Sequence, residues 1–178
     1  QLPEAATDTE KQQTLKAKIK HAEMLGMFLV TLGGGVGLIA FGPLCDAWGR
    51  RRAFLAYHVG GLVSGVLLFQ VIGSSSALAL WITLPIFGFL TLGMHAGYAI
   101  YFPELFPTRL RGTGAGFCFN GGRILAAPVL FLRGWMRDDV DGLGMSLNDT
   151  ASILSCLFLV AVVLLIFAPE TKGQELPE

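Results

Sequence analysis

Charged residues are missing from two long stretches of this chain. No Asp, Glu, Lys or Arg occurs between Met24 and Cys45, or between Ala53 and Pro103. Only 15% of the 178 residues are charged and 53% are hydrophobic, whereas a soluble domain carries about a quarter charged residues. The low charge excludes an ordinary soluble globular domain and indicates helices that lie in a lipid bilayer.

The chain also lacks the marks of several other functional classes. Its 13 basic and 13 acidic residues balance, so no excess of one sign indicates nucleic acid as a partner. Cys45, Cys118 and Cys156 are too scattered for a disulfide framework or a metal site, and we interpret them as packing residues. No nucleophile, zinc or phosphate-loop motif is present. We therefore expect no enzyme activity, no bound metal and no cofactor.

Five segments are long and apolar enough to cross a membrane, since a spanning helix needs roughly 20 apolar residues. The sequence predicts these spans at about residues 24–44, 53–72, 78–102, 113–132 and 150–168. The fold class is therefore all-α, a membrane bundle of five transmembrane helices. The flanking residues, 1–23 and 169–178, are predicted to be a polar connecting segment outside the cytoplasm and a cytoplasmic tail.

Glycine, in contrast, is abundant. Several of the 23 glycines cluster inside the apolar segments, at 33–35, 37, 60–61 and 121–122. Small residues allow transmembrane helices to approach closely, so we expect these clusters to be helix-packing surfaces. The cluster at 33–37 is not a phosphate-binding loop, because it lacks the Lys-Ser/Thr ending of that motif.

Short basic segments predict which end of the bundle faces the cytoplasm. The loops at 45–52 and 103–112 and the tail after the fifth span lie on one side, and their basic residues are Arg50, Arg51, Arg52, Arg109, Arg111 and Lys172. The positive-inside rule places that side in the cytoplasm. Four lysines in residues 1–23 disagree with this orientation, although four acidic residues balance them in charge. The chain is expected in a plasma membrane or a bacterial inner membrane.

Three motifs follow one another at the predicted helix boundaries. The first, GPLCDAWGRRR at 42–52, resembles the G-x-x-x-D-x-x-G-R-R signature of the major facilitator superfamily. PELFPTRLRGTG at 103–114 and PETKG at 169–173 resemble the segments after the tenth and twelfth helices of its sugar-porter-like and organic-ion members. The resemblance covers about residues 24–173. It implies helices eight to twelve, in the C-terminal six-helix half of a twelve-helix transporter, and hence a chain cut from a longer protein whose N-terminal half is its partner.

The resemblance also implies a gate made by these motifs. Its candidate residues are Gly42, Asp46, Gly49, Arg50, Arg51, Glu104, Arg109, Arg111 and Glu170. A carboxylate at a helix end can pair with arginine and accept hydrogen bonds from the N-terminus of a neighbouring helix. Such contacts can hold one face shut in one state and break in the other. The alternative is that the arginines only fix the topology and that the Glu104 segment is a solvated turn.

Arg123 is the main candidate for substrate binding, because it lies about ten residues into the fourth predicted span. An arginine at that depth normally faces a cavity or a partner, and its planar fork suits a carboxylate. Its surroundings resemble those in organic-anion transporters and aromatic-acid symporters. Asn120, His95 and Tyr98 are further candidates. The alternatives for Arg123 are an ion pair with a carboxylate of the N-terminal half, or a side chain that snorkels to the membrane interface. For His95 and Tyr98 the alternative is helix packing, and His58 is interpreted as structural.

The sequence thus predicts a secondary transporter that moves a small polar metabolite by alternating access. Arg123 favours an organic anion, whereas the PETKG ending favours a sugar. Proton coupling is implied by the resemblance, but the predicted spans contain no Asp or Glu, so a coupling carboxylate would lie in the N-terminal half. A non-transporting membrane subunit or sensor derived from half a transporter is the alternative from another class.

Overall fold

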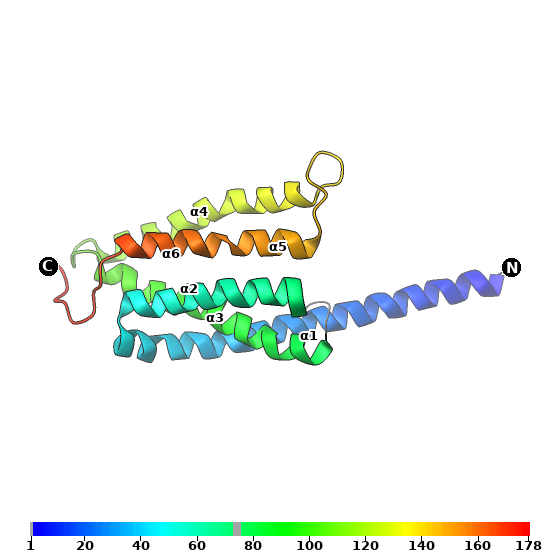
Figure 1. The fold of residues 1–178 in the computed structure, drawn as a ribbon, viewed down its shortest axis with the longest axis horizontal. Coiled ribbons are helices and arrows are strands. Elements are labelled where there is room, and N and C mark those ends of the chain that lie inside the picture. Colours follow the sequence, from blue (N-terminus) through cyan, green and yellow to red (C-terminus); the bar gives the residue numbers. More distant parts are fainter. Residues whose placement is uncertain (1, 73–75) are drawn as a thin grey trace.

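The computed structural model describes the backbone of residues 2–72 and 76–178 and the side chains of residues 10–71 and 76–178. These residues form helices and no strand, which confirms the predicted all-α class. The helices are α1 (Leu2–Trp48), α2 (Arg50–Val66), the π-helical turn η1 (Leu67–Ile72), α3 (Ala77–Glu104), α4 (Arg111–Arg137), α5 (Leu147–Ser155) and α6 (Leu157–Phe167). Figure 1 shows them running side by side along the long axis.

Five helical units are long and apolar enough to cross a membrane, as predicted. They are Glu10–Trp48, Arg50–Val71, Ala77–Glu104, Arg111–Arg137 and Leu147–Phe167. The last unit combines α5 and α6, which are separated only at Cys156. Residues before Met24 continue α1 as one helix, so the expected connecting segment and first span are not separated by a break. The point at which the membrane surface crosses α1 stays a prediction.

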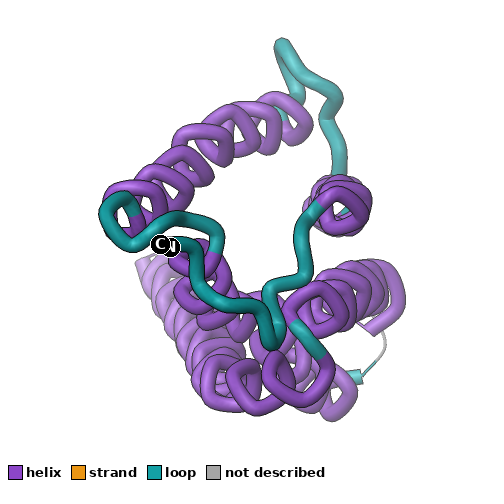
Figure 2. The backbone as a smooth tube through the Cα atoms, turned by 90° about the vertical axis from the view of Figure 1, so that its left-hand side faces the viewer, coloured by secondary structure: helices purple, strands orange, loops and turns teal. Residues whose placement is uncertain are grey.

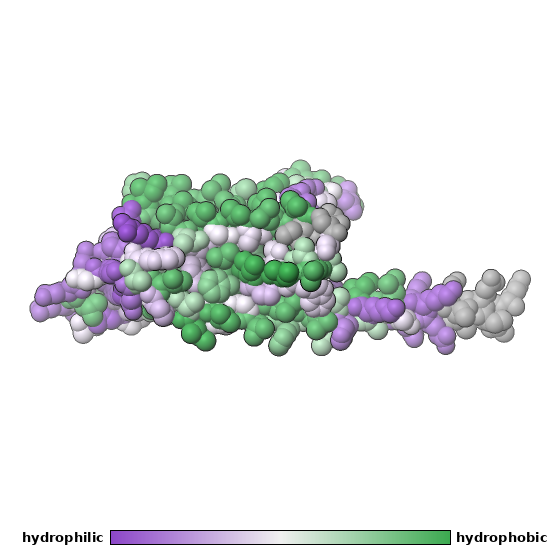
Figure 3. Space-filling model, turned by 60° about the horizontal axis from the view of Figure 1, so that its bottom comes forward, coloured by the Kyte–Doolittle hydropathy of each residue, from purple (hydrophilic) through white to green (hydrophobic). Residues whose placement is uncertain are grey.

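The two ends of the bundle differ in character. The α1–α2 and α3–α4 connections and the C-terminal tail share one end, at the left of Figure 1, whereas α1 extends alone beyond the other end. The space-filling view in Figure 3 shows hydrophobic residues over much of the side of the bundle, and hydrophilic residues at the tail end and along the α1 extension. This distribution is what an integral, multi-pass membrane protein requires.

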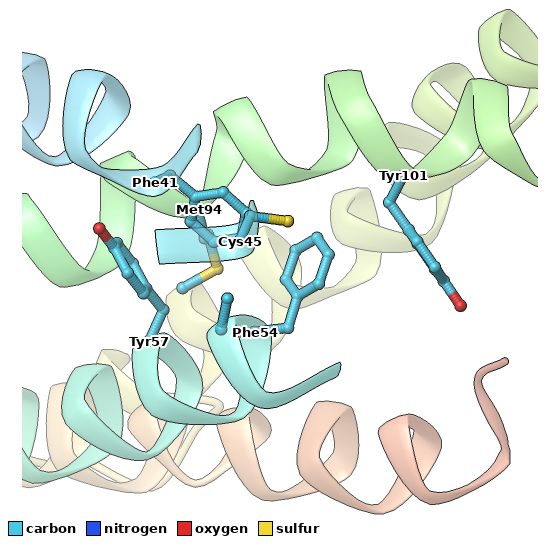
Figure 4. Close-up of a cluster of buried hydrophobic side chains, with 7 residues drawn as sticks. Phe41, Cys45, Phe54, Tyr57, Met94 and Tyr101 are labelled. Atoms are coloured by element: carbon cyan, nitrogen blue, oxygen red, sulfur yellow. The ribbon is translucent and has the colours of Figure 1, made fainter. Parts of the chain in front are cut away.

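A cluster of buried side chains fastens α1, α2 and α3 together near the tail end. Its residues are Phe41 and Cys45 of α1, Ala53, Phe54 and Tyr57 of α2, and Met94 and Tyr101 of α3. Figure 4 shows Phe41, Cys45, Phe54, Tyr57 and Met94 close together, with Tyr101 farther along α3. The Phe41 ring lies 5.1 Å from that of Phe54 and 4.9 Å from that of Tyr57. These edge-on and tilted contacts fix how the helix ends meet.

Glycines bring α1 and α3 into backbone contact farther along the bundle. A Cβ atom added at Gly33 would lie 1.9 Å from the carbonyl oxygen of Pro85, and one added at Gly37 would lie 2.3 Å from that of Phe89. Gly88 of α3 meets the carbonyl oxygen of Val30 in the same way, at 2.0 Å. The predicted packing role of the 33–37 cluster is therefore confirmed, except at Gly35.

The same role is wrong for residues 121–122 within the described chain. A Cβ added at Gly121 or Gly122 would meet no atom within 4 Å. The reason is that α4 contacts only α3 and α5 among the described helices, and Met136 is its one described buried residue. The middle of α4 thus presents an open surface.

Candidate functional site

An ion pair joins the α1–α2 loop to the end of α3. Arg50 begins α2, and its Nε and Nη2 atoms donate to the two carboxylate oxygens of Glu104 at 3.0 and 2.7 Å. The two side chains are 13% and 16% exposed. Asp46, one turn earlier, accepts from Nη1 of Arg50 at 3.1 Å but is itself 77% exposed. The two-pronged bond to Glu104 is therefore the strong contact, because it is both bidentate and shielded from water.

Glu170 reaches back from the tail to cap α2. Its Oε1 atom accepts from the backbone N–H of Arg50 at 2.8 Å, and its Oε2 atom accepts from that of Arg51 at 3.1 Å. A helix N-terminus needs such acceptors, and its dipole favours a carboxylate. The preceding residue, Gly49, has no side chain to supply a cap and adopts a φ of 91°. A Cβ there would lie 2.7 Å from Oε2 of Glu170, so glycine is required for both its conformation and the close approach.

The tail is attached to three helices at once. Lys172 donates from Nζ to the carbonyl of Ala47 at 2.8 Å, and Thr171 donates to Oε2 of Glu104 at 2.5 Å. Tyr101 of α3 donates to the carbonyl of Pro169 at 2.6 Å. Figure 2, which looks on to this end, shows the loops and the tail lying across the helix ends. We call the tail residues 169–172 and their partners the tail clasp.

Arg51 adds a link between α2 and α6. Its Nε and Nη2 atoms donate to the carbonyls of Leu165 and Ile166 at 3.1 Å each. These carbonyls lie in the last turn of α6, where a cation is favourable. The N-terminus of α2 and the C-terminus of α6 are thereby held together by a carboxylate and a guanidinium that act on opposite helix dipoles.

The pKa of Glu170 makes the tail clasp sensitive to acid. Partial burial tends to raise this pKa, but the hydrogen bonds from the backbone N–H groups of Arg50, Lys172 and Arg51 outweigh it and lower the pKa below its ordinary value. The contacts of Glu170 therefore contribute stability above the pKa of a free glutamate, about 4.3. That contribution is lost as the pH falls through the lowered folded value.

We expect the tail to detach reversibly when the pH is lowered from 7 through the lowered pKa of Glu170. A spin label at Glu175→Cys, in a variant whose native cysteines are replaced by serine, would report its mobility. Glu170→Gln should make the tail more mobile at pH 7 and weaken the response to acid, since the amide cannot be neutralised further. A wild-type tail of unchanged mobility across this range would contradict the role assigned to Glu170.

The structure brings together only part of the predicted gate. Asp46, Arg50, Arg51, Glu104 and Glu170 meet as described above. Arg109 is exposed and makes no hydrogen bond or ion pair within the described chain. Arg111 bonds the carbonyl of Pro103 at 3.1 Å, closing its own loop. Gly42 has no atom close to where a Cβ would stand.

The predicted substrate residues are spread over two helices. Arg123 and Asn120 are exposed on α4, and Asn120 donates to the carbonyl of Gly116 at 2.8 Å. His95 is exposed on α3, with its ring 6.1 Å from that of Tyr98. No hydrogen bond or ion pair in the described chain joins either α4 residue to either α3 residue. Arg123 lies near the middle of α4, twelve residues or roughly 18 Å from Arg111.

Tyr98 turns towards a buried histidine. Its hydroxyl lies 3.5 Å from Nε2 of His58, whose Nδ1 lies 2.7 Å from the carbonyl of Phe54. The Tyr98 ring also stacks on Phe54 at 5.1 Å. These contacts direct Tyr98 to the α2 side of α3, which favours the packing alternative for this residue over substrate contact. They also agree with a structural role for His58.

Sequence reasoning missed several members of the tail clasp. Thr171 and Lys172 belong to the same five-residue motif as Glu170, and this proximity was the available signal. Tyr101 gave no such signal, because an aromatic residue in an apolar span is usually a packing residue.

Comparison with known proteins also indicates a membrane transporter. Residues 14–178 match the model of the family described as sugar (and other) transporter. The inner membrane metabolite transport protein YhjE of Escherichia coli (strain K12) is 29% identical over 162 residues, which are 86% of this chain and 34% of that protein. The sialic acid transporter NanX of the same strain is 33% identical over 142 residues, 76% of this chain and 33% of its own length.

A third relative comes from another bacterium. The cis,cis-muconate transport protein of Acinetobacter baylyi (strain ATCC 33305 / BD413 / ADP1) is 32% identical over 118 residues, 66% of this chain and 27% of its own. The chain thus spans about a third of the length of the curated relatives that it matches. No solved structure matches it.

Proposed function

We propose that this chain, which belongs to the sugar (and other) transporter family of the major facilitator superfamily, forms helices eight to twelve of a secondary transporter. Five spans in order, with the basic loops and the tail gathered at one end, support this placement. The rest of that transporter would supply the opposing half, against which this one rocks around a site near the midplane.

The gate is proposed to be the set of contacts at the tail end. Arg50–Glu104 joins two helix ends, and the tail clasp joins the same ends to the C-terminus. When such charged groups separate, water hydrates them again, and this hydration offsets much of the free energy of the broken contacts. Rocking would therefore switch between a clasped and a released arrangement.

The substrate is proposed to be an organic anion that Arg123 holds. The observation that carries this proposal is a guanidinium near the middle of a membrane-length helix, exposed and without an ionic partner in the described chain. An arginine at that depth needs an anion or a water-filled cavity. Two of the relatives are named for carboxylates, sialic acid and cis,cis-muconate. A sugar is the second candidate, favoured by the PETKG ending.

Uptake into vesicles tests the proposal. The full reading frame that encodes this chain would be supplied with labelled aromatic carboxylates, aliphatic carboxylates and hexoses. Arg123→Ala is expected to reduce carboxylate uptake at least about tenfold, the loss that removal of a hydrogen bond to a charged group implies. Arg123→Lys should retain part of it, because the charge remains while the fork is lost.

Arg137→Ala is the matched control, because it removes the same charge from the end of the same helix. Hexose uptake that is equal in the wild type and in Arg123→Ala would contradict the organic-anion proposal and favour a sugar as the substrate. A protein that inserts correctly and takes up nothing would favour the non-transporting alternative. Dependence of uptake on an imposed pH gradient would test proton coupling separately.

A further inference from the structure

A groove on the flank of the tail end is lined partly by residues of the tail clasp and partly by residues outside the proposed gate, among them Arg52 and Leu55. It has a volume of about 510 Å³ and lies between the first turns of α2 and the last turns of α6. Its lining includes the basic residues Arg51, Arg52 and Lys172 and the apolar residues Leu55, Val162 and Ile166. The groove therefore combines a basic lining with an apolar lining.

The apolar lining continues along the outside of the membrane-spanning helices. Leu55 is 42% exposed and Ile166 is 64% exposed, and both belong to helices that are apolar enough to cross a bilayer. Trp48, which is 50% exposed, lines the groove at the end of α1. Tryptophan is enriched where the headgroups of a membrane meet its hydrocarbon. These features place the groove at the level of the headgroups.

The basic lining carries positive charge that the protein does not neutralise. Glu170 is the one acidic residue that lines the groove, and the backbone N–H groups of α2 occupy both of its oxygens. Arg51 and Lys172 spend hydrogen bonds on uncharged carbonyls. Arg52 makes no hydrogen bond or ion pair in the part of the chain that the structure describes. The groove thus offers an unused guanidinium beside an apolar surface.

We propose that this groove binds an anionic phospholipid of the adjacent leaflet, with its phosphate at Arg52 and Lys172 and its acyl chains along Leu55 and Ile166. A soluble phosphate would contact the basic residues but leave the apolar residues of the groove uncovered. The lipid satisfies both, and a basic residue near an anionic membrane surface contributes about 1 kcal/mol to such binding. Because its phosphate would join α2 to the tail, bound lipid would also hold the tail clasp in place.

Native mass spectrometry of the purified full reading frame would measure this binding. The protein would be titrated with phosphatidylglycerol or phosphatidylcholine of equal chain length. Phosphatidylglycerol is expected to bind more tightly, and Arg52→Gln is expected to weaken it about fivefold, the factor that corresponds to roughly 1 kcal/mol. Val162→Trp, which fills the groove without changing its charge, should also weaken it.

Arg109→Gln is the matched control, since Arg109 is exposed at the same end but does not line the groove. Its affinity for phosphatidylglycerol should equal that of the wild type. Equal losses in the two glutamine variants would indicate general surface charge and overturn the proposal. So would equal binding of the two lipids, or displacement of phosphatidylglycerol by glycerol phosphate at a similar concentration. The readout is lipid binding and not uptake, so failure of this proposal would leave the uptake test of Arg123 unaffected.

Discussion

Gly33→Ala is expected to prevent α1 and α3 from packing as they do in the structure. The added Cβ would lie 1.9 Å from the carbonyl oxygen of Pro85, and a backbone atom cannot rotate away as a side chain can. The helices would have to separate. We expect the free energy of unfolding to fall by an amount at or above the upper end of the ~1–3 kcal/mol that overpacking usually costs, because α3 is the main packing partner of α1.

Gly35→Ala is the matched control, because it adds the same methyl group to α1 where no neighbouring atom lies close. Gly35 lies on the same helix, two residues away, and a Cβ there would meet nothing within 4 Å. Alanine in a helix interior is favoured over glycine by about 0.5–1 kcal/mol. Gly35→Ala should therefore be neutral or stabilising, whereas Gly33→Ala and Gly88→Ala should be harmful.

The measurement is the fraction of protein that remains monodisperse in detergent after a series of heating steps. If Gly33→Ala and Gly88→Ala lost their monodisperse fraction at the same temperature as the wild type, the helices α1 and α3 would have to cross at a wider distance than in the structure. A loss of equal size in the Gly35 variant would point to an effect on helix insertion that has nothing to do with close packing.

The crossing shows how far the sequence could predict the fold. Charge-free stretches of the right length were sufficient to give the helices, because a bilayer forces each apolar span to satisfy its own backbone. The small residues at 33–37 were correctly identified as a packing surface. Their partners, Gly88 and the carbonyls of Pro85 and Phe89, were not predicted. A glycine pattern shows that a helix can be approached closely, but not which helix approaches it.

The candidate site was also predicted only in part. Motif resemblance selected Arg50, Glu104 and Glu170, and the structure brings all three to one end of the bundle. It did not indicate that Glu170 caps a helix that begins 120 residues earlier, because that role depends on backbone groups and these are the same in every sequence. Arg123 marks the opposite case, in which the residue is conspicuous in the sequence but makes no ionic contact in the described chain.

Glu104→Ala is expected to release the tail end of α3. It removes a bidentate, largely shielded partner of Arg50 and the acceptor of the Thr171 hydroxyl, and leaves Arg50 with exposed Asp46. A hydrogen bond to a charged group contributes about 1.5–3 kcal/mol, so we expect a thermal destabilisation of this order. The exchange of the two residues, Arg50→Glu with Glu104→Arg, should restore part of it.

Cys45 provides an internal probe of opening at this site. It is 1% exposed, and its carbonyl lies 3.5 Å from Nη1 of Arg50, so it lies directly behind the ion pair. In a variant with Cys118→Ser and Cys156→Ser, the rate of alkylation by a small maleimide would report how often the network opens. Glu104→Ala should raise this rate, and the double exchange should lower it again.

Arg50→Lys separates a gate from a topology signal. Lysine keeps the positive charge that the membrane reads, but it cannot make the two parallel bonds to Glu104. If arginine acts only on topology, Arg50→Lys should leave both the melting temperature and the alkylation of Cys45 unchanged. If the pair is a gate, the lysine variant should insert normally and yet resemble Glu104→Ala in both measurements. The second result is expected, because the structure uses the planar fork of Arg50 and not its charge alone.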